Sequence, residues 1–261
     1  MNKNILLILL AVITTLVGIS QEEKKILIFT KNGKGYVHDN ITASIEAIMK
    51  ISKENNIKVD TSTNSSVFTD KNLKQYDALI FSNTNNEVFD TDEQKIAFIR
   101  YTEAGGGFVG IHSTCATERD WHWFQQVVGG NFVRHAPFQK FTIKIIDPEH
   151  TSTDFFTSDW VREDECYYVN NINPDIHVLL AADLATVEDK GKETYPANTF
   201  SLFPLAWYHE FDGGRQWFTA LGHSIDDYSM PLFVQHITGG ILWAVEKGKP
   251  DYSKAKSVNL K

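Results

Sequence analysis

Hydrophobic positions along the chain fall into short unbroken runs separated by amphipathic stretches. Residues 24–30 (KKILIFT), 78–82 (ALIFS) and 107–112 (GFVGIH) are apolar without polar alternation, which is typical of strands buried on both faces of a parallel sheet. Between them, helical spacing begins near residues 39–40, with isoleucines at 41, 45, 48 and 51, and strand character resumes at 57–61. Strand and helix in alternation predict right-handed crossovers and an α/β, doubly wound, mostly parallel sheet.

A second helix is predicted from its end signals. Thr91 and Gln94 have the spacing of a capping box, in which each side chain bonds a backbone amide at the start of the helix. Ile96 and Ile99 are expected to form its inner face, and Gly105 is placed to end it. This helix connects the strands predicted at 78–82 and 107–112.

The later part of the chain has a different period. Apolar residues alternate with polar ones at 141, 143 and 145, and strands are also predicted at 167–169, 177–182, 205–211 and 215–221. Asp212-Gly213-Gly214 predicts a tight hairpin, and a final helix is expected over about 231–245. No linker rich in Pro, Gly or Ser interrupts the chain. We therefore expect one domain over 21–261, a flavodoxin-like sheet with a strand-rich C-terminal extension.

Residues 1–20 have the pattern of a secretory signal peptide. Lys3 is the lone positive charge before the apolar run 5–17, and Gly18 and Ser20 are small residues suited to cleavage before Gln21. A membrane anchor is the rival interpretation, but the run is shorter than the ~20 residues that span a bilayer. We therefore expect a periplasmic or secreted protein with no stable membrane anchor after cleavage.

Composition narrows the class of protein. The 261 residues are 42% hydrophobic and 22% charged, with a formal net charge of −8, as expected of a soluble globular protein. The acidic balance argues against a nucleic-acid partner, which normally meets a basic face. Cys115 and Cys166 are the only cysteines, so at most one disulfide can form, and the sequence leaves open whether they are paired.

Candidate chemistry lies where the predicted parallel strands end, because ligands of open α/β sheets bind outside the carboxyl ends of the strands. His38 follows the first strand, Asn83 the third, and His112 and Ser113 the fourth. These side chains are expected to converge on one crevice. His112 occupies the sharp strand-to-helix turn where other proteins place a nucleophile, and Cys115, three residues later, is an alternative nucleophile if a base lies nearby.

The chain resembles the ThuA-like (trehalose utilisation) family, a branch of the class I glutamine amidotransferase-like superfamily. The resemblance covers about residues 24–248 and rests on several stretches in the expected order. These are His38, GGGFVGIHS at 105–113, the segment 124–135 ending in His135, DECY at 164–167, Pro204 and Trp207, and GGRQWFTALGHS at 213–224. The nucleophilic cysteine elbow of the amidotransferases is replaced by Gly-Ile-His-Ser-Thr, so glutamine hydrolysis is not carried over.

The resemblance implies a role in carbohydrate catabolism, since family members are associated with disaccharide breakdown beside dehydrogenases that make 3-keto sugars. The motifs contain five candidate catalytic residues: His38, His112, His135, Glu165 and His223. We expect His112 to be a base or a metal ligand and Glu165 its partner carboxylate. Such a set suits Zn, Ni or Fe, but metal-free acid–base chemistry by a histidine is the alternative, and no nucleotide cofactor is expected.

Substrate contacts are expected from a second group of residues. Hydroxyl or ring contacts with a small-molecule carbohydrate are assigned to Ser113, Asn83, Tyr167, Trp207 and Arg215. An aromatic residue in a strand is more often part of the core, and Arg215 could equally be a surface residue. The leading hypothesis is an enzyme acting on a disaccharide, glycoside or 3-keto-sugar. Its rivals are a non-catalytic sugar-binding module and a Cys-dependent hydrolase, and the oligomeric state is left open.

Overall fold

The computed structural model describes residues 23–190, 195 and 200–257. The signal peptide predicted at 1–20 lies outside these residues. Within them, every helix is too short or too polar to cross a lipid bilayer.

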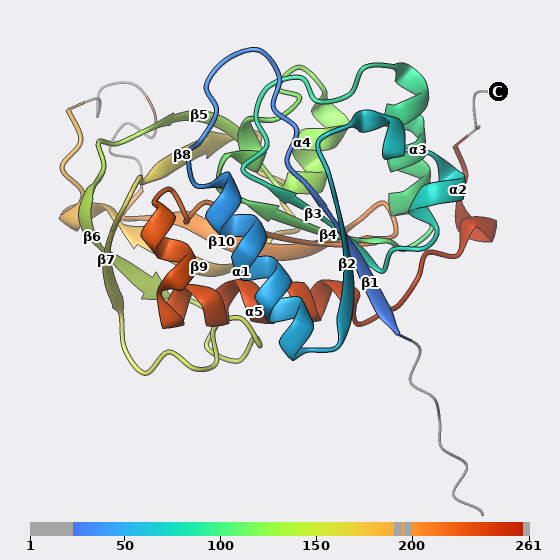
Figure 1. The fold of residues 1–261 in the computed structure, drawn as a ribbon. Helices are drawn as coiled ribbons and strands as arrows, with labels where there is room; N and C mark the ends of the chain where they lie inside the picture. The colour runs from blue at the N-terminus through green and yellow to red at the C-terminus, as the bar shows by residue number, and fades with distance from the viewer. Residues whose placement is uncertain (1–22, 191–194, 196–199, 258–261) are drawn as a thin grey trace, which may run out of the picture.

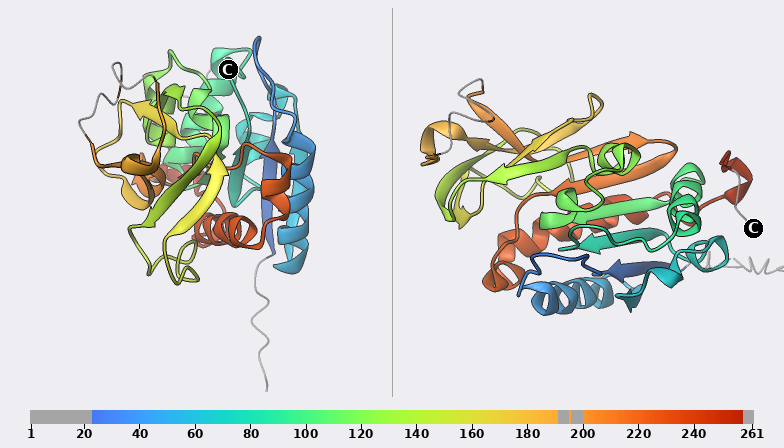
Figure 2. Two further views of the ribbon diagram at one scale, coloured as in Figure 1. Left: turned by 90° about the vertical axis from the view of Figure 1, so that its left-hand side faces the viewer. Right: turned by 90° about the horizontal axis from the view of Figure 1, so that it is seen from above.

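The fold is built on one nine-stranded mixed sheet with helices packed on both of its faces (Figures 1 and 2). Its strand order is β2-β1-β3-β4-β11-β10-β9-β6-β7. The strands in this order are β2 (Ile57–Ser62), β1 (Lys24–Phe29), β3 (Ala78–Ser82), β4 (Gly107–Ile111), β11 (Gly214–Thr219), β10 (Leu202–Phe211), β9 (His177–Asp183), β6 (Gln139–Ile145) and β7 (Trp160–Asp164). The α/β, flavodoxin-like fold class predicted from the sequence is confirmed.

The first five strands in this order, β2 to β11, are parallel. In such an order the chain leaves β1 and β3 in opposite directions, and the crevice between them is the usual ligand site of flavodoxin-like sheets. Three helices connect these strands: α1 (Ile41–Glu54), α2 (Asp70–Leu73) and α3 (Asp92–Glu103). Helix α4 (His122–Val128) leads from β4 to the small second sheet, and α5 (Pro231–Val245) follows β11.

The remaining strands form the antiparallel half of the sheet. Hairpin β10–β11 turns at Asp212 and Gly213, whose φ angles of 50° and 90° suit the primed turn that the sequence predicts. Beyond it, β9, β6 and β7 pair antiparallel in turn. A separate two-stranded sheet pairs β5 (Asn131–His135) with β8 (Tyr167–Asn170). The sequence did not predict β5, β7 or α4.

Neighbouring side chains of β11 show how the helices cover the two faces, because successive residues of a strand point to opposite sides. Trp217 packs against His236 of α5, whereas Phe218 packs against Trp207 on the other face. Both tryptophans are fully buried.

One detail of the sequence prediction is wrong. Thr91 does cap α3 by accepting a hydrogen bond from the Gln94 amide, and Gly105 follows the helix in a left-handed conformation. The buried face of the helix, however, is made by Ala97, Phe98, Tyr101 and Thr102 rather than by Ile96 and Ile99, which are only half-buried. The Phe98 ring packs on the sheet, and this contact sets the rotation of the helix about its own axis.

Candidate functional site

The fourth strand ends in a strained turn that presents a histidine. His112 follows β4 with φ of 53°, a left-handed conformation that is uncommon for residues other than glycine. Two residues before it, Gly110 lets Phe218 of β11 pack closely, since a Cβ there would lie 2.9 Å from a ring carbon of Phe218. Strain of this kind collects at functional sites. The turn directs the His112 ring toward the carboxyl ends of the neighbouring strands.

Four of the five predicted catalytic side chains meet around this ring. His112 Nε2 lies 3.1 Å from His38 Nε2, 3.4 Å from His223 Nδ1 and 3.8 Å from Glu165 Oε2. His223 Nδ1 is 3.1 Å from the same carboxylate oxygen. The fifth residue, His135, places its Nδ1 3.3 Å from Glu165 Oε1. Segments distant in the sequence therefore form one cluster, as predicted, with one ligand-type atom from each of four residues within 4.8 Å of the others.

Two predicted substrate contacts also belong to this cluster. Ser113 Oγ is 3.2 Å from His38 Nδ1, and the Tyr167 hydroxyl is 3.0 Å from His112 Nε2. Both side chains are buried, and the contacts that they make are with the histidines. Tyr167 nevertheless lines the cavity over the cluster.

A buried polar frame holds the converging segments in place. The Asp164 carboxylate accepts hydrogen bonds from the amides of Glu165, Gly222 and His223 at 2.8, 3.0 and 3.4 Å. Asn40 Nδ2 donates to the carbonyls of Gly222 and His223 at 2.7 and 2.8 Å, which ties the segment after His38 to the same turn. These contacts come from the protein alone, and they fix the two turns that carry Glu165 and His223.

Burial and neighbouring charges set the protonation of the cluster. Burial, together with the nearby His223, lowers the pKa of His38 to about 4. Burial also lowers the pKa of His112, so both imidazoles are neutral at pH 7. The hydrogen bond to Glu165 raises the pKa of His223. For Glu165 itself burial raises the pKa, but the bond to His223 and the charges of the surrounding histidines outweigh it, and its pKa is lowered overall.

A cavity of about 370 Å³ opens over the cluster. His38, His135, Glu165, His223, Ser113 and Tyr167 line it, together with Tyr36, Asn85, Ala116, Arg119 and Phe132, which the sequence reasoning missed. The same rule that found His38 and His112 could have found three of these, because Tyr36, Asn85 and Arg119 follow the first, third and fourth strands. Phe132 lies on β5, a strand that the sequence did not reveal.

Three predicted substrate contacts lie elsewhere, and these expectations are corrected. Trp207 is fully buried and its indole N–H donates to the Val128 carbonyl, so it offers no stacking face. Arg215 stands at the start of β11, at the opposite edge of the sheet, where it pairs with Glu246 and stacks on Trp243. Asn83 is buried beneath the site and donates to the Tyr228 hydroxyl.

The cysteines are unsuited to nucleophilic catalysis. Both are free and buried. Burial raises the pKa of the Cys115 thiol well above its usual range and that of Cys166 to about 12. A nucleophilic cysteine needs a lowered pKa. Cys115 instead donates weakly to the His112 carbonyl at 3.6 Å.

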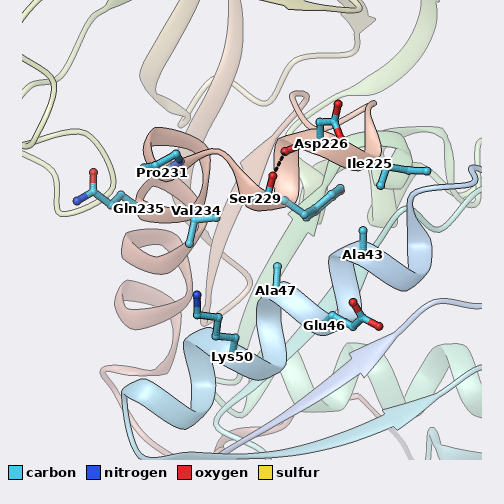
Figure 3. Close-up of a pocket in the computed structure, with 11 residues that line it drawn as sticks. Ala43, Glu46, Ala47, Lys50, Ile225, Asp226, Ser229, Pro231, Val234 and Gln235 are labelled. Carbon is cyan, nitrogen blue, oxygen red and sulfur yellow. Dashed lines mark hydrogen bonds between the residues drawn. The ribbon is translucent and has the colours of Figure 1, made fainter.

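A second hollow, of about 720 Å³, lies between α1 and the turn that leads into α5 (Figure 3). Ala43, Ala47 and Val234 give it an apolar floor, and Glu46 and Lys50 stand at its sides. No histidine lines this hollow in the part of the chain that the structure describes. The histidine cluster therefore belongs to the cavity at the carboxyl ends of the strands and not to this hollow.

Comparison with known proteins agrees with this fold. A ThuA-like protein from Bacteroides uniformis ATCC 8492 superposes with a TM-score of 0.69 and 21% identity, covering 88% of this chain and 96% of that one. A ThuA-like protein from Parabacteroides merdae ATCC 43184 gives 0.68 and 17%, covering 91% and 93%. A β-galactosidase from Bacillus circulans gives 0.53 and 14%, covering 88% of this chain but 32% of that one.

No curated protein sequence matches the chain significantly. The family model described as trehalose utilisation matches residues 25–244. The chain therefore belongs to the ThuA family.

Proposed function

We propose that the protein is an enzyme of carbohydrate catabolism that acts on a disaccharide, a glycoside or a 3-keto-sugar. The observation that carries the proposal is the meeting of four histidines and one glutamate, from separate segments, beneath a single cavity. A volume of about 370 Å³ is at the lower end of the range for small-molecule sites, about 300–1,000 Å³, and suits one sugar unit at a time. Membership of a family described by trehalose utilisation supports the substrate class.

The lining supplies the two kinds of contact that a sugar needs. Tyr36 and Phe132 line the cavity with aromatic rings, and Tyr36, which is 63% exposed, offers a ring face for the apolar side of a pyranose. Asn85 and Arg119, which hydrogen-bond each other at 3.4 Å, supply an amide and a guanidinium for hydroxyl groups. These residues take the binding role that the sequence had assigned to Trp207 and Arg215.

Proton transfer is the chemistry that the cluster supports. Glu165 touches both His135 and His223, so a proton removed from a sugar carbon or hydroxyl can be taken up and returned within the pocket. His135 is the most accessible of these imidazoles, with 41% of its side chain exposed. Elimination, hydration or isomerisation next to a carbonyl needs only such groups. A double-displacement glycosidase would need a second carboxylate, and Glu165 is the one carboxylate that lines this cavity among the described residues.

The place of action is part of the proposal. A signal peptide at residues 1–20 would send the mature chain to the periplasm or beyond, where disaccharides and glycosides first reach the cell. The net charge of −8 argues against a nucleic acid as the partner. N-terminal sequencing of the protein exported by its host would reveal cleavage before Gln21.

The decisive experiment incubates the mature protein with a panel of disaccharides and their 3-keto forms, followed by mass spectrometry. Glu165→Gln and His112→Asn should lower turnover by about 10²–10⁴-fold, the usual contribution of general acid–base groups. Asparagine is chosen because it tolerates the left-handed backbone at position 112. His122→Ala, an exposed histidine on α4, is the matched control and should retain full activity.

Two results would contradict the enzymatic proposal. Calorimetric binding of a sugar without any product would identify a sugar-binding module that serves a neighbouring enzyme or transporter. Full turnover by folded Glu165→Gln and His112→Asn would place the chemistry outside this cluster.

A further inference from the structure

The cluster has the donor atoms and spacing of a metal site. We propose that His38 Nε2, His112 Nε2, His223 Nδ1 and Glu165 Oε2 bind one divalent transition-metal ion. Histidine and carboxylate donors favour Zn²⁺, Ni²⁺ or Fe²⁺ over Mg²⁺ or Ca²⁺, which prefer oxygen alone. The inference rests on the proposed function only for the metal's chemical role; the binding site itself does not depend on any substrate.

The distances fit a single central ion. Bonds of 2.0–2.2 Å arranged tetrahedrally place neighbouring ligand atoms about 3.3–3.6 Å apart. Four pairs of the proposed ligand atoms are separated by 3.1, 3.4, 3.8 and 3.1 Å, and every pair lies within 4.8 Å. This range of distances between ligand atoms allows a distorted tetrahedron or a site with a further ligand from the cavity.

The His112 ring nitrogen at the centre of the cluster carries a lone pair. His112 Nδ1 faces the Ala220 carbonyl at 2.8 Å, so this nitrogen must be the donor and Nε2 carries a lone pair. The Tyr167 hydroxyl, at 3.0 Å, can satisfy that lone pair, but His38 Nε2 and His223 Nδ1 also face it. A cation at the centre would bind this lone pair, those of His38 Nε2 and His223 Nδ1 when their ring protons lie on the other nitrogen, and the carboxylate charge of Glu165.

The outer contacts of the proposed ligands are those that metal-binding histidines need. The second ring nitrogen usually donates to a carbonyl, carboxylate or hydroxyl, which fixes the ring and its tautomer. Ala220 serves His112 in this way, and Ser113 Oγ, 3.2 Å from Nδ1, serves His38. Asp164 holds the backbone of both Glu165 and His223. These contacts fix the ring orientations and the two segments before any ion arrives.

The position of the site gives the ion a function. His38, Glu165 and His223 line the sugar-sized cavity, so a bound ion would be available to polarise a hydroxyl or carbonyl oxygen of the substrate. Proton transfer then falls to His135, which contacts Glu165 Oε1, the carboxylate oxygen that does not face the ion.

The test measures metal binding without a substrate. Untagged mature protein is stripped with chelator, dialysed, and titrated with Zn²⁺, Ni²⁺ and Co²⁺, with calorimetry, elemental analysis and the visible spectrum of Co²⁺ as readouts. We expect one ion per chain, a Co²⁺ spectrum typical of four- or five-coordination, and a melting temperature that rises with Zn²⁺ concentration. His223→Ala and Glu165→Gln should each weaken Zn²⁺ binding at least tenfold, while His122→Ala binds like the wild type.

Less than one ion per chain, or unchanged Zn²⁺ affinity in folded His223→Ala, would overturn the metal site. The His223 side chain is partly exposed, so this variant is expected to fold even where a change at His112 does not. Failure of the two proposals can be told apart. Sugar turnover by a protein that binds no Zn²⁺ in the titration would remove the metal site and keep the enzyme. Stoichiometric metal binding without turnover of any sugar would keep the metal site and remove the enzyme.

Discussion

At the scale of single residues, the backbone at His112 decides what the site can be. A left-handed residue at the end of a parallel strand lifts its side chain above the sheet, and related folds use this turn to expose a nucleophile. Here the side chain is an imidazole with one nitrogen committed to the Ala220 carbonyl. The other nitrogen faces His38 and His223 beneath the cavity, so the turn presents a base or a ligand rather than an attacking group.

The first prediction concerns the thiols. Because Cys115 and Cys166 are buried and unpaired, neither should react with a disulfide reagent such as Ellman's reagent while the protein is folded. Two thiols per chain should react in denaturant. Rapid labelling of the native protein would show an accessible, activated cysteine, and fewer than two thiols after unfolding without reductant would reveal a disulfide.

At the scale of elements, the turn after β7 is joined to the turn after β11 by one carboxylate. Asp164 is completely buried, accepts three backbone amides and lies 3.0 Å from Arg162, which also pairs with Asp227. Burial raises the pKa of Asp164, and Arg162 partly offsets this shift. These contacts bring Glu165 and His223 together although they lie in different elements.

The second prediction follows from that junction. Asp164→Asn should lower the free energy of unfolding by about 3 kcal/mol, because it breaks a buried ion pair and replaces an acceptor with a donor. Urea unfolding measures the change. Asp226→Asn, an exposed neighbour of the same turn, should stay within about 0.5 kcal/mol of the wild type. Equal effects of the two substitutions would show that Asp164 does not join the segments.

At the scale of the whole molecule, buried neutral histidines make stability depend on pH. His236 is fully buried between the Ser152 carbonyl and the Thr219 hydroxyl, and burial lowers its pKa to about 3. Burial likewise lowers the pKa of His209 to about 4. An unfolded histidine takes up a proton near pH 6.5, so below that pH the unfolded chain binds more protons than the native one. The contribution of these two histidines to the free energy of unfolding is therefore fully present above pH 6.5. It is lost progressively as the pH decreases toward 3.

The third prediction tests this dependence. The free energy of unfolding, measured with urea in the presence of chelator, should decrease from pH 7.5 to pH 5.0. In His236→Gln that decrease should be smaller by about 1–2 kcal/mol, since one proton-linked group is removed. His122→Gln, at an exposed position, should follow the wild-type curve. An unchanged pH dependence in His236→Gln would mean that His236 has the same pKa in the native and unfolded states.

The sequence predicted the parallel half of the sheet well because unbroken apolar runs and helix caps are local signals. It also placed His38 and His112 at one edge, since that follows from strand direction alone. Arg215 could have been excluded by the same rule, because it begins a strand rather than ends one. Glu165 is different: four strands separate β7 from β4 in the sheet, and only the packing of the antiparallel half brings this carboxylate to His112. Hydrophobic periodicity carries no information on that packing.

This arrangement has a consequence for dynamics. His38 and His112 follow strands of the parallel half, whereas Glu165 follows the edge strand of the antiparallel half. Any ligand held by all three links the two halves directly. Amide hydrogen exchange at the ends of β4 and β7 should then slow together on binding, because opening at either strand end would break contacts with the same ligand.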